Sequence, residues 1–127
     1  FDVVYSSPQE RAIQTAEIAT GMKAHIDARL DVYDLGEAEG LTKNEVKLKN
    51  GVPDPQFYKG MEDGNEYIQR IFAFMEDLEK SCKNLNVFIS GHQCTTGAIE
   101  AYFHGLPLDG NILRLSSANG EYKIYDF

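Results

Sequence analysis

The sequence predicts an α/β fold with a mostly parallel sheet, and three local patterns carry this prediction. Two strand–turn–helix units begin with the short apolar segments 3–5 and 87–89, whose β-branched and aromatic residues are typical of buried strands. In each unit small polar residues follow the strand, and a helical pattern follows them. The third pattern is the Asn119-Gly120 pair between two alternating segments, which predicts an antiparallel hairpin near the C-terminal end.

Length and composition suit one domain, residues 1–127. The chain is 43% hydrophobic and 25% charged, and its formal net charge of −8 argues against nucleic acid or an anionic membrane surface as a partner. No apolar segment approaches the roughly 20 residues that span a bilayer. Cys82 and Cys94 form neither a disulfide framework nor a metal-ligand spacing, so we expect a cytoplasmic protein. We expect no metal and no other cofactor.

The first helix has clear start and stop signals. Ser7, Pro8 and Glu10 fit a capping box, with Ser7 at the N-cap, Pro8 at the first helical position and Glu10 at the third. The helix should run to about Thr20, and Gly21 should end it.

Arg11 stands in the first turn of this predicted helix. A cation there opposes the helix dipole, which costs a few tenths of a kcal/mol up to about 1 kcal/mol. One interpretation is that an anion binds nearby. The other is that Arg11 simply pairs with Glu10 or with a neighbouring helix.

The middle of the chain contains one strong helix and two irregular stretches. Residues 25–30 are compatible with a short second strand, and the acidic segment 31–40, with its two glycines, is predicted to be a loop. Residues 50–64 are predicted to be an irregular connection. Apolar residues then keep the i, i+3, i+4 spacing over 66–82, which predicts a helix whose apolar face lies in the core.

His92 follows the second predicted strand at the point where a helix is about to begin. Ligands, and anions in particular, collect at the carboxyl ends of strands and at helix N-termini in open α/β sheets. The alternative is that His92 is an ordinary polar loop residue. Cys94 suggests a cysteine-dependent phosphatase, but Glu100 stands six positions later, where such enzymes need an arginine, and this excludes that class.

Three motifs in order resemble the histidine phosphatase superfamily, the phosphoglycerate mutase-like family. Residues 6–17, SSPQERAIQTAE, resemble its Ser-Ser-Pro…Arg-Ala…Gln-Thr-Ala segment, and residues 35–42 resemble its Gly-x-x-Glu-Gly loop. Residues 89–92 with the helix end at 101–108 resemble its second-histidine segment. The resemblance covers essentially the whole chain. It implies a phosphoglycerate mutase-like, three-layer α/β/α sandwich with a C-terminal antiparallel hairpin.

By this resemblance, Arg11 binds the phosphoryl group and His92 is the second pocket histidine. Such a histidine stabilises the charge on the transferring phosphoryl group, and the backbone N–H of Gln93 is expected to help. The implied activity is a phosphatase or a mutase acting on a small phosphorylated metabolite. The alternative is a non-catalytic phosphate-binding or interaction module derived from the same fold.

Two departures from the family pattern stand out. The family's nucleophile is a histidine in an Arg-His-Gly motif on a preceding strand, and the chain begins where the family's second strand begins. The domain is therefore expected to be N-terminally incomplete and inactive by itself, because losing a covalent nucleophile costs on the order of 10⁶ in rate. Val32 occupies the family's proton-donor position, and Asp31, Asp34 and Glu37 remain alternatives. A missing interior strand would leave a sheet edge open, so a homo-oligomer is possible.

Overall fold

The computed structural model describes residues 1–34, 48–49, 52–53, 59–60, 62–108, 112–118 and 120–127. Among these residues no helix is long and apolar enough to cross a bilayer. The loop motif at 35–42, including Glu37, lies outside the described residues, as does much of the irregular connection expected over 50–64.

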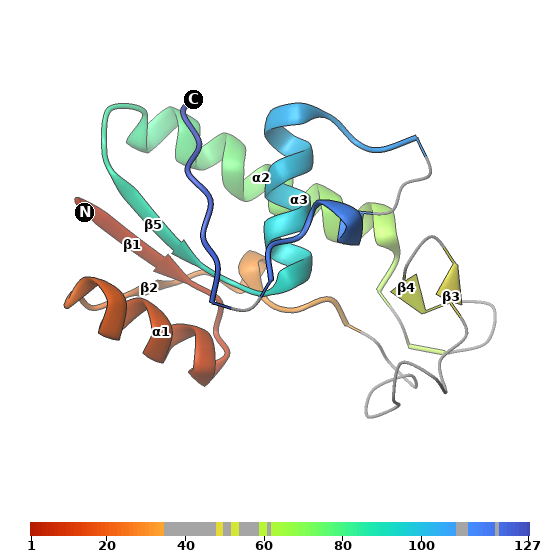
Figure 1. Cartoon of the computed structure of the whole chain (residues 1–127), viewed down its shortest axis with the longest axis horizontal. Coiled ribbons are helices and arrows are strands. Elements are labelled where there is room, and N and C mark those ends of the chain that lie inside the picture. Colours follow the sequence, from red (N-terminus) through yellow and green to blue (C-terminus); the bar gives the residue numbers. More distant parts are fainter. Residues whose placement is uncertain (35–47, 50–51, 54–58, 61, 109–111, 119) are drawn as a thin grey trace.

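A three-stranded parallel sheet has the strand order β2–β1–β5 and lies on the left in Figure 1. Its strands are β1 (Val3–Ser6), β2 (His25–Ile26) and β5 (Val87–Ser90). Strand β1 pairs with β5 in parallel, with Tyr5 opposite Ile89. The predicted parallel pairing of the two strand–turn–helix units is therefore confirmed.

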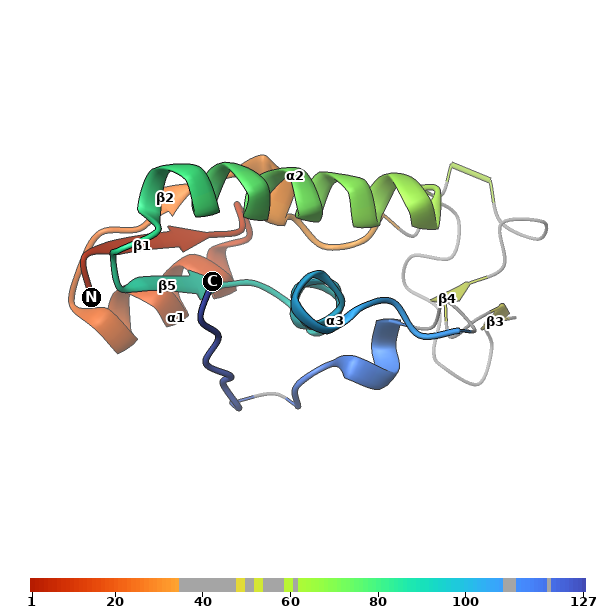
Figure 2. The same ribbon diagram turned by 90° about the horizontal axis from the view of Figure 1, so that it is seen from above.

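Helices cover both faces of this sheet, which confirms the three-layer arrangement. Helix α1 (Glu10–Thr20) lies on one face and α2 (Gly64–Cys82) on the other, as Figure 2 shows. Helix α3 (Gln93–His104) follows β5 and packs against α2. Side chains alternate across the strands, so Val4 points toward α1 while Val3 packs on the α2 side.

The hydrophobic core is larger on the α2 side of the sheet than on the α1 side. On the α1 side it consists of small side chains, Val4, Ala16 and Ala24, with Phe88 packed against them. The α2 side holds the larger cluster, whose buried members come from α2, α3 and the segments beside them: Leu30, Tyr33, Tyr67, Ile71, Phe74, Met75, Leu78, Cys82, Ala98, Ile99 and Ile112. The helix predicted over 66–82 supplies most of this cluster, as its apolar spacing indicated.

Several short elements complete the described chain. A 3₁₀ turn, η1 (Ala28–Leu30), follows β2, so the strand expected over 25–30 is only two residues long. Strands β3 (Leu48–Lys49) and β4 (Val52–Pro53) pair with each other in an antiparallel ladder.

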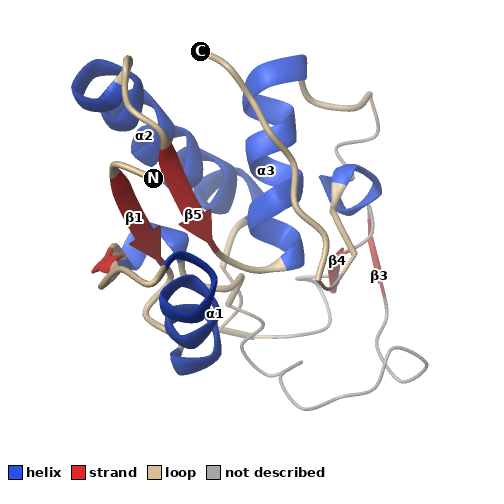
Figure 3. Ribbon diagram, turned by 60° about the vertical axis from the view of Figure 1, so that its left-hand side comes forward, coloured by secondary structure: helices blue, strands red, loops and turns tan. Residues whose placement is uncertain are grey.

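The predicted C-terminal hairpin is wrong in the described residues. Ile112–Leu115 forms a 3₁₀ turn, η3, and residues 121–127 form no strand but run along α3 (Figures 1 and 3). The ring of Tyr125 stacks on Phe103 with a centroid separation of 4.6 Å, and its hydroxyl donates to Glu100. Packing against α3 thus replaces strand pairing.

No described strand pairs with the second edge of β5, the edge away from β1. The homo-oligomer that an open edge would favour stays a prediction.

Candidate functional site

The structure brings Arg11 and His92 together from opposite ends of the chain. Arg11 lies in the first turn of α1, directly after β1, and His92 is the N-cap residue of α3, directly after β5. Because β1 and β5 are adjacent and parallel, their carboxyl ends meet at one edge of the sheet. Arg11 Nη2 lies 3.4 Å from His92 Nδ1.

Three contacts hold His92 in place. Its ring Nε2 lies 2.9 Å from the hydroxyl oxygen of Ser7, and its backbone N–H donates to Thr95 Oγ1 at 3.0 Å. Gly91 precedes it because there is no room for a side chain: a Cβ there would lie 2.7–2.9 Å from the Thr95 side chain. The ring is half-buried and lies between the Ser7 hydroxyl, near Nε2, and the Arg11 guanidinium, near Nδ1.

Ser7 does not have the role that the capping-box pattern predicts. Helix α1 begins at Glu10 with Gln9 as its N-cap residue. Ser7 instead continues the strand pairing, since its backbone N–H donates to the carbonyl of Ser90 at 3.0 Å. Its hydroxyl accepts from the Gln9 backbone N–H and reaches the ring of His92. The local sequence pattern predicted a capping role for Ser7. It could not indicate the contact with His92, because the two residues are 85 positions apart in the sequence.

The surroundings of His92 keep its ring neutral at pH 7. Burial lowers its pKa below the ordinary value of 6.5, and the nearby Arg11 cation lowers it further, while the carboxylate of Asp31 acts in the opposite direction. Arg11 itself is exposed. The site therefore presents one permanent positive charge beside an imidazole whose neutral form is favoured.

Asp31 is the described acid that faces this site. Its Oδ1 accepts from the Gln9 side chain at 2.9 Å and from the Val32 backbone N–H at 2.8 Å. Asp34 is exposed, and its backbone N–H donates to Glu62. Of the three acids left open by the sequence, Asp31 is the one whose charge acts on His92 among the described residues, and Glu37 lies outside them.

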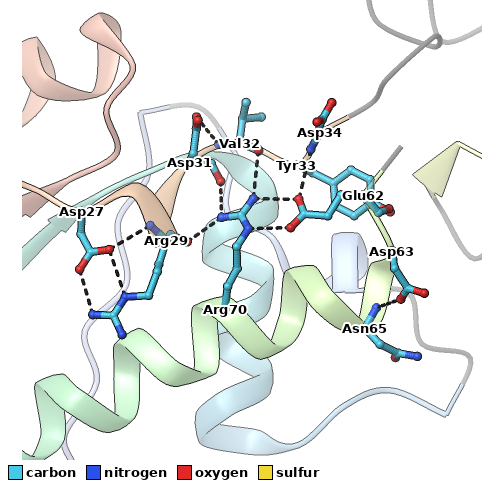
Figure 4. Close-up of polar contacts among 10 residues, drawn as sticks. All are labelled: Asp27, Arg29, Asp31, Val32, Tyr33, Asp34, Glu62, Asp63, Asn65 and Arg70. Atoms are coloured by element: carbon cyan, nitrogen blue, oxygen red, sulfur yellow. Dashed lines mark hydrogen bonds and ion pairs between the residues drawn. The ribbon is translucent and has the colours of Figure 1, made fainter. Parts of the chain in front are cut away.

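Arg70 holds the backbone that carries Asp31, and sequence reasoning missed it (Figure 4). Its guanidinium donates to the carbonyls of Arg29, Asp31 and Val32 at 2.6, 2.9 and 3.2 Å. The same group makes a two-point contact with the carboxylate of Glu62, at 2.7 and 2.9 Å. The only sequence signal was a charged residue on the apolar side of α2, three positions after Tyr67 and four before Phe74.

An open cleft of about 440 Å³ lies beside Arg70, lined by Asp31, Val32, Asp34 and Glu62 among others. Neither Arg11 nor His92 lines it, and Asp31 is the residue that links it to the site. Within the described part of the chain, no group of three or more His, Cys, Asp or Glu residues is placed to hold a metal ion.

The sequence matches the model of a known protein family. The model for the histidine phosphatase superfamily, branch 1, matches residues 1–127. The chain belongs to the histidine phosphatase superfamily. Two curated members of related sequence are "Putative phosphoserine phosphatase 2" of Hydrogenobacter thermophilus, 31% identical over 119 residues, and "Probable fructose-2,6-bisphosphatase" of Schizosaccharomyces pombe, 30% identical over 114 residues.

The histidine phosphatase fold is also found in solved structures. YhfR of Bacillus stearothermophilus superposes with a TM-score of 0.69 at 26% identity, covering 86% of this chain. The product of open reading frame Rv3214 of Mycobacterium tuberculosis superposes with a TM-score of 0.70 at 22% identity, covering 90%.

The chain is shorter than these proteins. Its matches cover 85% and 84% of the chain but only 58% and 27% of the two curated proteins, and about 60% of each solved structure.

Proposed function

We propose that the pocket between Arg11 and His92 binds the phosphoryl group of a small phosphorylated metabolite, in a phosphatase or mutase of the superfamily. The observation that supports this most directly is the 3.4 Å approach of the Arg11 guanidinium to the His92 ring at the carboxyl ends of two parallel strands. A planar guanidinium fork suits two phosphate oxygens. Family membership supports phosphorylated ligands as the substrate class.

Each residue has a proposed role in this pocket. Arg11 donates to the phosphoryl oxygens, and His92 stabilises the negative charge once its ring is protonated. Gln93 is exposed at the first position of α3, where backbone N–H groups point out of the helix toward an anion. Asp31 is the proposed acid of the site, because its carboxylate acts on His92.

Anion binding tests the pocket directly. Titration of the 127-residue chain with inorganic phosphate, followed by calorimetry, should give a binding isotherm that weakens with added salt. Arg11→Ala should weaken binding roughly 10- to 100-fold, because hydrogen bonds to a charged group contribute about 1.5–3 kcal/mol. Lys83→Ala is the matched control: it removes the same charge from an exposed position at the end of α2 and should bind like the parent. Equal binding by Arg11→Ala would place the anion elsewhere.

Turnover tests whether a histidine described in this chain acts as the nucleophile. The other two histidines have other neighbours: His25 is exposed on β2 beside the ring of Tyr5, and His104 faces Glu100 at the C-terminal end of α3. We therefore expect the 127-residue chain to bind phosphate but to hydrolyse p-nitrophenyl phosphate negligibly and to form no phosphohistidine. An acid-labile phosphoryl label on His92 would contradict this and make His92 the nucleophile.

A further inference from the structure

The two nitrogens of the His92 ring have partners of different chemistry. Nε2 lies 2.9 Å from Ser7 Oγ, and Nδ1 lies 3.4 Å from Arg11 Nη2. A serine hydroxyl can donate or accept a hydrogen bond, whereas a guanidinium can only donate. The two partners together therefore favour one tautomer of the neutral ring: Arg11 disfavours a proton on Nδ1, and Ser7 can accept a hydrogen bond from Nε2.

Nδ1 must present its lone pair, because an N–H there would point at an N–H of Arg11. With Nδ1 unprotonated, the proton of the neutral imidazole would be on Nε2, which lies 2.9 Å from the Ser7 hydroxyl oxygen that would accept its hydrogen bond. The opposite tautomer would turn the contact with Arg11 into a repulsion between two donors.

Ser7 is well placed to be a permanent acceptor. Its residue is 0% exposed, and its backbone is fixed by the hydrogen bond to the Ser90 carbonyl. Its hydroxyl oxygen also accepts from the Gln9 backbone N–H at 3.2 Å. Strand pairing and the start of α1 thus hold the Ser7 oxygen in front of the His92 ring.

We propose that Ser7 is a positioning residue that holds the neutral His92 ring with its proton on Nε2, so that Nδ1 takes up a proton when an anion enters. The part that concerns the anion rests on the proposed function. The tautomer itself depends only on the contacts in the empty site.

Proton uptake follows from the charges around the ring. Arg11 from α1 disfavours protonation, and Asp31 from the segment after η1 favours it. An anion bound to Arg11 offsets the positive charge that disfavours protonation of His92. The same anion is repelled by the lone pair on Nδ1 until Nδ1 binds a proton. Protonated Nδ1 then becomes a donor to the anion. Because binding and protonation favour each other, anion affinity should rise as pH falls from about 7.5 toward 5.5.

Nitrogen-15 NMR of histidine-labelled protein tests the tautomer. The parent at pH 8 should show His92 with the proton on Nε2. Ser7→Ala should shift the population toward a mixture, and Ser7→Thr, which keeps a hydroxyl, should restore it. The resonances of His25 and His104 are internal controls and should not change. A parent with the proton on Nδ1 would overturn the proposal, and this measurement needs no variant to fold. An unchanged tautomer in folded Ser7→Ala would overturn the role of Ser7.

Sulfate calorimetry tests the proton uptake, because sulfate does not titrate in this pH range. At pH 7, in buffers of different ionisation enthalpy, the parent should take up a substantial fraction of one proton per sulfate bound, and His92→Gln should take up close to none. Arg11-dependent binding without proton uptake would contradict this inference while leaving the proposed function intact. Binding that is independent of Arg11, or no binding at all, would contradict the proposed function, and the NMR result would still decide the tautomer.

Discussion

Arg70→Ala is expected to lower the free energy of unfolding by about 2–4 kcal/mol, among the largest effects of any single change outside the core. The alanine leaves the carboxylate of Glu62 without its guanidinium, and the Glu62 side chain is only 16% exposed. It also removes the donors to the three backbone carbonyls that shape residues 29–32. Urea denaturation followed by circular dichroism measures the change.

Two variants of the same helix make this result specific. Arg70→Lys keeps the charge but cannot reproduce the fork, so we expect it to recover only part of the loss. Gln69→Ala changes an exposed neighbour on α2 and should stay within about 0.5 kcal/mol of the parent. If Arg70→Ala were as stable as Gln69→Ala, the contacts of Arg70 would be dispensable for the fold.

Gly97→Ala should be the second most damaging change, with a loss of about 3 kcal/mol. Gly97 lies in the buried middle of α3, where a Cβ would approach the backbone carbonyl oxygen of Ile112 to well under 3.0 Å and lie 3.1 Å from its carbonyl carbon. Backbone cannot rotate aside as a flexible side chain can, so α3 and η3 must separate. Thermal unfolding should show a clearly lower midpoint.

Gly64→Ala is the matched control, since it makes the same chemical change in the first turn of α2. There the nearest atom to a new Cβ is the Tyr33 hydroxyl oxygen at 4.0 Å, an ordinary contact distance. Alanine is the better helix former by up to about 1 kcal/mol, so this variant should be as stable as the parent or more stable. A Gly97→Ala protein that matches Gly64→Ala would show that α3 and η3 can move apart freely.

The sequence by itself determined the parts of this protein that depend on neighbouring residues. The apolar segments at 3–5 and 87–89, followed by helical patterns, predicted parallel strands at the centre of an α/β sandwich, and the structure confirms them. The sequence also predicted the helix over residues 66–82 from its apolar face. It predicted the end of the first helix at Gly21, which adopts a φ of +68° that suits glycine. Arg11 and His92 were located because each follows one of these strands.

Only the tertiary structure decided which side chains meet across the chain. Ser7 satisfied a local capping pattern, yet strand pairing with Ser90 places its hydroxyl against His92 instead. The alternating C-terminal segment had the pattern of a strand, but Tyr125 packs on Phe103 of α3. Arg70 had only its position on an apolar helix face to mark it. Short-range patterns specify helices and strands because those depend on neighbouring residues, whereas these contacts exist only once the sheet and its helices have brought distant segments together.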